Sequence, residues 1–408
     1  MLPLIKLFMV LAIMVGLIRL KVDVGVTLFI CALILGMAFG MPFEEIGSSV
    51  FGAFTDLWTW ELVAMVVLIN CLGGILKHTE KINAIAESIE FFTRDIRVSL
   101  AAIPAFIGLL PMPGGALLSA PLAGEIGDKA GLSPEKKTIV NYWFRHVWEY
   151  MFPLYPGVIV SAGIFSVPIS TIIWANIALT PVALLSGFAL IMGGVKYRLA
   201  PDIKGGLASN SRLLIMSIWP VAAVIMAYAL GLKLDIPYAL VISLILVIGV
   251  LALQTRGFAG YRGELFKGSL KADIIFLLVA VMVFKAVVED SSSVEQLPSI
   301  FDALGLPIPL VLFVVPAIVG LLTGITVGYV GSTFPLLAPI IAAEGFAPGY
   351  FMLAYVGGYM GVMASPVHLC LVLSRQYYGA DMGKVYRMLL PLLAAMSLSA
   401  VLLSGVLF

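Results

Sequence analysis

Long apolar stretches, each close to the length that crosses a lipid bilayer, recur along the whole chain. A transmembrane helix needs about 20 predominantly apolar residues. Ten runs near that length occur, at 1–18, 22–40, 57–76, 139–164, 169–194, 213–231, 236–254, 273–289, 349–374 and 385–407. The sequence therefore predicts an all-α polytopic membrane protein with short connections between its crossings.

The composition excludes several classes of protein. Of the 408 residues, 61% are hydrophobic and 12% are charged, whereas a soluble domain has about 45–50% apolar and about 25% charged residues. An ordinary soluble enzyme is therefore excluded, and a net charge of +1 offers no basic field to a nucleic acid. The cysteines, Cys31, Cys71 and Cys370, lie inside apolar runs without CxxC spacing. They are interpreted as small core residues, with no metal site predicted.

Two further apolar stretches, 98–127 and 308–343, are interrupted halfway by glycine and proline. The first contains Pro111-Met112-Pro113-Gly114-Gly115, and the second contains Thr323-Gly324, Gly328 and Gly331. Irregular backbone persists at membrane depth only where it lines a cavity or is buried in protein. Each stretch is therefore predicted to be a re-entrant hairpin, which enters the membrane and leaves on the same side.

The distribution of basic residues supports this layout. With both hairpins counted as non-crossing and the N-terminus outside, 20 of the 24 Lys and Arg residues fall in cytoplasmic loops. Cytoplasmic loops of membrane proteins carry such an excess. The predicted location is the cytoplasmic (inner) membrane, with both termini outside.

A short internal repeat indicates a duplication. The segment Pro104-Ala105-Phe106-Ile107-Gly108-Leu109-Leu110 matches Pro316-Ala317-Ile318-Val319-Gly320-Leu321-Leu322, and each opens an interrupted stretch. Each half then holds five crossings, one hairpin and a proline-broken helix. Because five is odd, the second half must be inverted relative to the first, as in many secondary transporters.

The chain is accordingly divided into paired parts. Helices 1–76 and 213–289 form a predicted scaffold, and 98–194 and 308–408 form a predicted transport domain. The transport domain contains the hairpins 98–127 and 308–343 and the broken helices 139–164 and 349–374. Two interfacial segments are predicted, the amphipathic helix 77–97 and the connector 290–307. They either link a fixed scaffold to a moving transport domain or are passive connectors on the membrane surface.

The segment Pro104 to Leu122, PAFIGLLPMPGGALLSAPL, resembles an uncharacterised integral membrane family within the ion transporter superfamily. That superfamily includes citrate, dicarboxylate, gluconate and arsenite permeases. The resemblance implies a homodimer with an elevator-type mechanism, in which a transport domain slides against a scaffold. It does not extend to the Ser-Asn-Thr motif at the hairpin tips of the dicarboxylate carriers, which is absent here, so neither dicarboxylate specificity nor sodium coupling is implied.

Charged residues at membrane depth are costly and therefore mark candidate sites. Arg145, His146 and Glu149 precede the break at Pro153, and His368 follows the break at Ser365-Pro366. Glu149 and Ser365 are predicted to hold a coupling ion, Na⁺ or H⁺, and Arg145, His146, Ser365 and His368 to bind substrate. Arg145 and Glu149, four residues apart, could alternatively form a structural pair on one helix face, as could Lys285 and Glu289.

The hairpin tips complete the predicted substrate site. Glycines allow close backbone approach, and helix N-termini offer N–H groups to an anion. The residues proposed there are Gly114, Gly115, Thr326, Ser332 and Thr333. The alternative is that the glycines only allow tight helix packing.

The leading functional hypothesis is an ion-coupled secondary active transporter for a small, anionic solute, with no cofactor and no catalytic or metal-binding residues. A primary pump is disfavoured because no GxxxxGK[ST] loop occurs, and an intramembrane enzyme because no HExxH occurs. The predicted partners are the solute, membrane lipids and a second copy of the chain. A channel or a lipid-handling carrier on the same fold remains the alternative.

Overall fold

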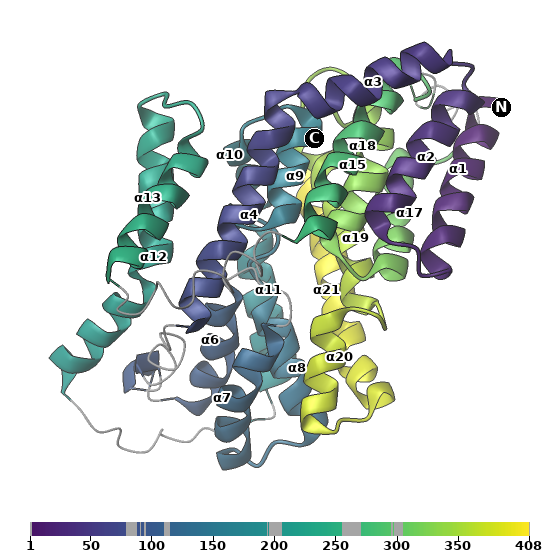
Figure 1. Ribbon diagram of the computed structural model, residues 1–408. Helices are drawn as coiled ribbons and strands as arrows, with labels where there is room; N and C mark the ends of the chain where they lie inside the picture. The colour runs from purple at the N-terminus through teal and green to yellow at the C-terminus, as the bar shows by residue number, and fades with distance from the viewer. Residues whose placement is uncertain are drawn as a thin grey trace.

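The computed structural model describes residues 2–78, 88–89, 91–93, 95–109, 115–193, 195, 206–254, 271–294, 297 and 305–407, and within them the secondary structure is helical, with no strand. Figure 1 shows the helices running mainly along one direction, with both termini near the same end. The helices of the first half are α1 (Leu2–Arg19), α2 (Val24–Ala38), α3 (Phe43–Thr55), α4 (Leu57–His78), α6 (Ile96–Gly108), α7 (Ala116–Lys129), α8 (Pro134–Arg145), α9 (Pro156–Phe165), α10 (Ile169–Asn176), α11 (Leu179–Gly187) and the π-helix η1 (Phe188–Met192).

The second half contains fewer and longer helices. They are α12 (Leu207–Lys233), α13 (Ala239–Gln254), α15 (Ala272–Asp290), α17 (Ile308–Thr323), α18 (Thr326–Ile341), α19 (Pro348–Ala364), α20 (Leu369–Tyr378) and α21 (Met382–Leu407). Helices α1, α2 and α15 pack together, while α12 and α13 form a separate pair that contacts α4.

Several helices are long and apolar enough to cross a membrane. In the described chain four spans meet that criterion, at Leu57–Lys77, Leu207–Lys233, Pro348–Tyr378, which contains both α19 and α20, and Met382–Val406. Helices α9 and α10, bent by 114°, would add a fifth if they formed one span. These helices agree with a multi-pass membrane protein, and the full number of ten crossings stays a prediction.

Helix α3 lies in the connection between the apolar runs 22–40 and 57–76, for which no helix is predicted. It lies across one end of the molecule (Figure 1). Ile46, Ser49 and Ala53 are its buried residues, and Ser49 donates a 2.5 Å hydrogen bond to Asp290. Phe43 and Phe51, 80% and 70% exposed, lie on the other side. An apolar spacing of three and four residues produces this face, so the segment is a helix rather than a loop.

Both interrupted stretches form pairs of packed helices. Helix α6 packs on α7, and α17 packs on α18. Figure 1 shows α6 and α7 toward the lower end and α17 and α18 toward the upper end. The tip of the first pair, 110–114, and most of the predicted interfacial segments 77–97 and 290–307 lie outside the described residues.

The first proline-broken helix is interrupted earlier than the sequence predicts. Helix α8 ends at Arg145 and α9 begins at Pro156, which leaves 146–155 in turns. Proline lacks an N–H group and clashes with the carbonyl four residues earlier, so Pro153 and Pro156 together prevent helix formation over a long stretch. The second break is shorter, between α19 and α20 at 365–368.

The predicted crossing 169–194 is also interrupted, at Ile177 and Ala178. It consists of α10, α11 and η1. Pro181 would clash with the carbonyl of Ile177, four residues earlier, which accounts for the interruption. Asn176, the last residue of α10, donates a 3.0 Å hydrogen bond to the carbonyl of Tyr150.

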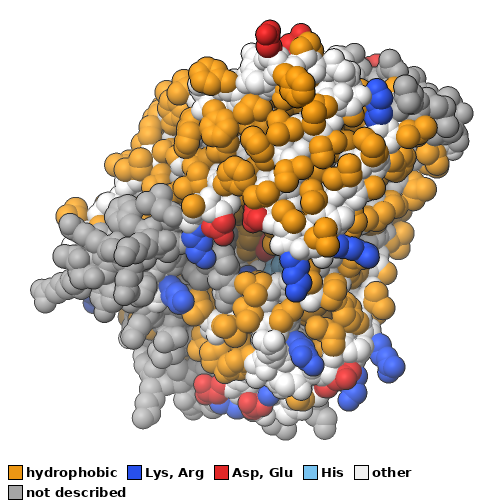
Figure 2. Space-filling view, turned by 45° about the vertical axis from the view of Figure 1, so that its right-hand side comes forward, with side chains coloured by type: hydrophobic (Ala, Val, Ile, Leu, Met, Phe, Trp, Pro, Cys, Tyr) orange, Lys and Arg blue, Asp and Glu red, His pale blue; other side chains and the backbone are white. Residues whose placement is uncertain are grey.

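Charged side chains gather at the lower end of the face in Figure 2, and hydrophobic side chains cover most of its upper part. The ends of α7, α8 and α21 carry ion pairs. They join Lys129 to Glu125, Lys137 to Asp128 and Lys384 to Glu135, over 2.9, 2.7 and 3.8 Å. This end is therefore suited to an aqueous phase, in keeping with the predicted cytoplasmic side.

Candidate functional site

A cavity of about 280 Å³ lies where the two broken helices meet the break between α17 and α18. Its walls come from the 146–155 turn, from Gly324–Val327, from the start of α20, and from α4 and α15. Elements far apart in the sequence thus meet at one place, close to the middle of the helical assembly.

The carbonyl groups released by the α8–α9 break are bound by side chains of other helices. Tyr355 and Tyr359 of α19 donate hydrogen bonds to the carbonyls of Glu149 and His146, over 2.7 and 3.1 Å. Thr180 binds the carbonyl of Val147 over 2.9 Å. A buried carbonyl without a partner is costly, so these side chains make the irregular backbone possible.

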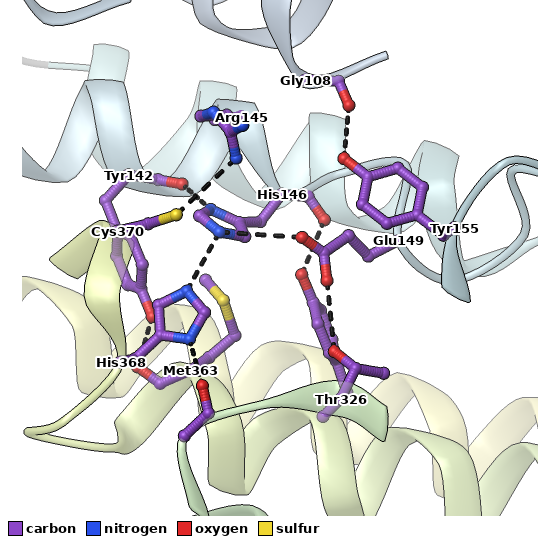
Figure 3. Close-up of polar contacts among 12 residues, drawn as sticks. Gly108, Tyr142, Arg145, His146, Glu149, Tyr155, Thr326, Met363, His368 and Cys370 are labelled. Carbon is purple, nitrogen blue, oxygen red and sulfur yellow. Dashed lines mark hydrogen bonds and ion pairs between the residues drawn. The ribbon is translucent and has the colours of Figure 1, made fainter. Parts of the chain in front are cut away.

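Three ionisable side chains and one hydroxyl come together at the cavity (Figure 3). The Nε2 atom of His146 lies 3.2 Å from Nε2 of His368 and 3.7 Å from a carboxylate oxygen of Glu149. The other carboxylate oxygen of Glu149 accepts a hydrogen bond of 3.3 Å from Thr326. His146 and His368 are 2% and 9% exposed, and Glu149 is 8% exposed. This cluster is therefore buried within the helices but faces the cavity.

The two histidines are oriented by backbone carbonyls. Nδ1 of His146 lies 2.5 Å from the carbonyl oxygen of Tyr142, and Nδ1 of His368 lies 2.7 Å from that of Gly324. A carbonyl only accepts hydrogen bonds, so each Nδ1 must carry the proton. The Nε2 atoms then both present lone pairs to the cluster.

Helices α9, α18 and α20 begin at this cavity. Pro156, Thr326 and Cys370, each in a first turn, line it. At none of these three N-termini does the N-cap side chain cap the helix. The first N–H groups of a helix and its dipole favour negative charge. Arg145, 2% exposed, adds a positive charge to the same wall.

The structure brings five of the predicted site residues together, and they line the cavity: Arg145, His146, Glu149, Thr326 and His368. Ser365 is buried beside Gly324, behind the wall. Ser332 and Thr333 donate hydrogen bonds to carbonyls within their own helix, α18, over 2.7 Å each.

Of the two glycines predicted at the first hairpin tip, the structure describes Gly115. Gly115 precedes α7 and is not among the lining residues, and Gly114 lies outside the described residues.

The alternative pairing of Arg145 with Glu149 does not form as a helical contact. Because α8 ends at Arg145, the two residues are not on one helix face. Nη1 of Arg145 instead donates to the sulfur of Cys370 over 3.7 Å. The other alternative pair is present: Nζ of Lys285 lies 3.7 Å from Glu289, at a distance from the cavity wall.

Two residues that line the cavity, Cys370 and Tyr155, are not among the site residues predicted from the sequence. Cys370 was interpreted as a core residue because it lies in an apolar run, and Tyr155 was not singled out. The hydroxyl of Tyr155 donates a hydrogen bond to the carbonyl of Gly108, which ties the α6 hairpin to this wall. The sequence does place Cys370 two residues after the predicted site residue His368, which indicates that Cys370 is near the site.

Comparison with known proteins places this architecture in a family. A family model described as "Protein of unknown function (DUF401)" matches residues 2–407. The chain belongs to the DUF401 family. No curated protein matches this DUF401 chain. The YdaH transporter from Alcanivorax borkumensis, whose crystal structure is described as revealing an unusual topology, is similar in structure.

The similarity to YdaH covers 89% of the DUF401 chain and 88% of that chain, with a TM-score of 0.61 and 18% sequence identity. At this identity the likeness shows a shared fold. The DUF401 chain therefore has the fold of this membrane transporter.

Proposed function

We propose that this DUF401 protein is an ion-coupled secondary active transporter that moves a small anionic solute across the cytoplasmic membrane. The observation that carries this proposal is the meeting of three helix N-termini and Arg145 at one buried cavity. Helix N-termini directed at an anion near the membrane midplane are a recurring device of secondary transporters. The fold shared with the YdaH transporter supports this proposal. The proposal includes a relation to the permeases of the ion transporter superfamily.

Glu149 is the proposed residue for the coupling cation, Na⁺ or H⁺. It is the acidic residue of the cavity wall, and Thr326 from the α17–α18 break contacts it. A carboxylate in this position would attract a cation while Arg145 and the helix N-termini attract the anion. Occupation of both sites would then leave less net charge to carry through the membrane, where isolated charge is costly.

A first experiment identifies the solute. The purified protein is heated with citrate, succinate, phosphate or sulfate, with and without sodium and at several pH values. We expect at least one anion to raise the melting temperature, since a ligand that binds only the folded state stabilises it. Stabilisation by lipid alone, with no response to any anion, would contradict the proposal.

Glu149→Gln tests the coupling. The stabilising anion, radiolabelled, is offered to proteoliposomes under an imposed ion gradient. We expect gradient-driven uptake to be abolished in E149Q, because the amide keeps the shape and removes the charge. Glu289→Gln, which changes the half-exposed partner of Lys285 outside the cavity wall, is the matched control and should keep its uptake. Full uptake by E149Q would remove Glu149 from the mechanism.

The lipid-handling alternative has one observation in its favour. A second cavity of about 300 Å³ lies between α1, α17 and α18 and is lined entirely by apolar side chains, among them Leu7, Val314 and Leu337. Such a surface fits an acyl chain. If this cavity served the function, lipid would protect the protein and Leu337→Trp would abolish that protection, while the polar cavity would be dispensable.

A further inference from the structure

The side chains around His146 and His368 have an arrangement that neither anion binding nor cation coupling requires. One ring nitrogen of His146, one ring nitrogen of His368 and Sγ of Cys370 all lie within 4.8 Å of one another. All three residues are buried, with Cys370 8% exposed. Two imidazoles and one sulfur at this separation are a common ligand set for zinc.

The two imidazole nitrogens need something between them. Because each Nδ1 is bound to a carbonyl, both Nε2 atoms present lone pairs, and these face one another over 3.2 Å. Two lone pairs at hydrogen-bond distance repel unless a proton or a metal ion lies between them. In a tetrahedral site with Zn–N bonds of about 2.0–2.1 Å, two nitrogen ligands are about 3.3 Å apart. The observed separation therefore suits a shared metal ion.

The groups around the proposed ligands also suit a metal site, because they orient the imidazoles and add charge beside the sulfur. Imidazoles that bind a metal usually donate their other N–H to a carbonyl or carboxylate, as His146 and His368 do to Tyr142 and Gly324. The guanidinium of Arg145, 3.7 Å from the sulfur of Cys370, would balance the negative charge of a metal-bound thiolate. Glu149, 3.7 Å from Nε2 of His146, is within reach as a fourth ligand.

We infer that His146, His368 and Cys370, with Glu149 as the fourth ligand, form a binding site for Zn²⁺. A shared proton would relieve the repulsion between the two imidazoles, whereas a metal ion would in addition bind the sulfur of Cys370 and the carboxylate of Glu149. Zn²⁺ accepts nitrogen, thiolate and carboxylate ligands together in a tetrahedral arrangement. The cavity beside the cluster provides a route for the ion. The site goes beyond the proposed transport function, because metal binding is an equilibrium property that does not depend on uptake.

Equilibrium binding tests the inference. The full-length protein in detergent, reduced with a phosphine and freed of metal by a chelator, is dialysed against ZnCl₂, and the bound metal is measured by mass spectrometry. We expect one Zn²⁺ per chain, and loss of this binding in His368→Gln and Cys370→Ser. Cys71→Ser, the same substitution at a buried cysteine of α4, is the control and should keep the full stoichiometry. Absence of binding by the unmodified protein, or equal loss in C71S, would overturn the inference.

Cobalt provides a readout that needs no variant. Co²⁺ replaces Zn²⁺ in tetrahedral sites and gives a thiolate-to-metal charge-transfer band together with intense visible bands. We expect both in the unmodified protein, and we expect one equivalent of ZnCl₂ to remove them. A cobalt spectrum without a thiolate band would overturn the inference even if the variants failed to fold. The effect of anions on the melting temperature of the unmodified protein is independent of this result, so the two proposals can fail separately.

Discussion

Single residues of the site divide into those that the sequence reveals and those that it conceals. Arg145, His146, Glu149 and His368 stand out because charge at membrane depth is rare and because each is close to a proline. Cys370 does not stand out, since a cysteine in an apolar run is usually a small buried residue. Its role depends on a fold that brings α20 to the end of α8, and no local pattern contains that information.

A residue outside the membrane-spanning helices provides a test of the electrostatics. Asp95 precedes α6, and its carboxylate accepts hydrogen bonds from the backbone N–H and the guanidinium of Arg97, over 2.9 Å in each case. The Arg97 guanidinium holds the pKa of Asp95 below its ordinary value. A lowered pKa means that the contribution of Asp95 to stability is present above about pH 3.9 and is lost as pH falls through the folded-state pKa.

Asp95→Asn should therefore remove a pH-dependent part of the stability. Asparagine still caps the helix, so only the ion pair is lost, at a cost of about 0.5–1 kcal/mol near neutral pH. Melting temperatures of both proteins in detergent, measured at pH 6 and pH 3, should differ at pH 6 and converge at pH 3. An equal difference at both pH values would contradict this assignment.

At the scale of elements, glycine and proline clusters predict where helices are interrupted, but not how far. Proline chemistry explains why α8 and α9 are separated by ten residues, at 146–155, once the structure shows which side chains bind the released carbonyls. Helix α3 was missed because its segment contains Glu44, Glu45 and two glycines, which are typical of loops. Its buried face is nevertheless present in the sequence, as the apolar residues Ile46, Val50 and Ala53 at spacings of four and three.

The internal repeat has a physical counterpart in helix packing. Gly108 of α6 lies against the carbonyl of Arg145 in α8, and Gly320 of α17 lies against the carbonyl of Gly358 in α19. Both glycines occupy the same position in the repeated segment, and both approach a broken helix so closely that a Cβ would overlap the carbonyl oxygen. This agreement supports the predicted duplication.

Gly108→Val and Gly320→Val should each destabilise the protein by about 3 kcal/mol, because backbone atoms cannot move aside as a flexible side chain can. Gly249→Val in α13 is the matched control, since its Cβ would meet nothing within 4 Å. Thermal melting in detergent measures all three. A loss in Gly249→Val as large as in the other two would show that valine in a helix, rather than the close contact, is responsible.

For the whole molecule, the sequence predicts more than the structure tests. The helical fold and its multi-pass character follow from the spacing and apolarity of the runs, because every membrane-spanning helix needs an apolar run of its own. The sidedness of the membrane follows from the distribution of basic residues, and no feature of an isolated protein reports it. The homodimer and the sliding transport domain rest on resemblance, because contacts between copies are not encoded in a simple periodicity.

Cysteine accessibility tests the sidedness. Single cysteines at Lys137 and Lys384, in a background lacking Cys31, Cys71 and Cys370, should react with a membrane-impermeant maleimide only after the cells are permeabilised. A cysteine at Glu44, at the start of α3, should react in intact cells. The pattern follows from the excess of Lys and Arg in cytoplasmic loops. The opposite pattern would reverse the predicted orientation and place both termini inside.

The bonding of the broken backbone also limits how the cavity could open. Carbonyls of His146 and Glu149 are held by Tyr359 and Tyr355 of α19, so α8, α9 and α19 share one set of hydrogen bonds. A local gate that swung the 146–155 turn away from α19 would break these bonds together, in surroundings where water cannot replace them. Displacement of the three helices as one body breaks none of them. Access to the cavity would then change at the border with α4 and α15, which are the cavity walls that belong to the predicted scaffold.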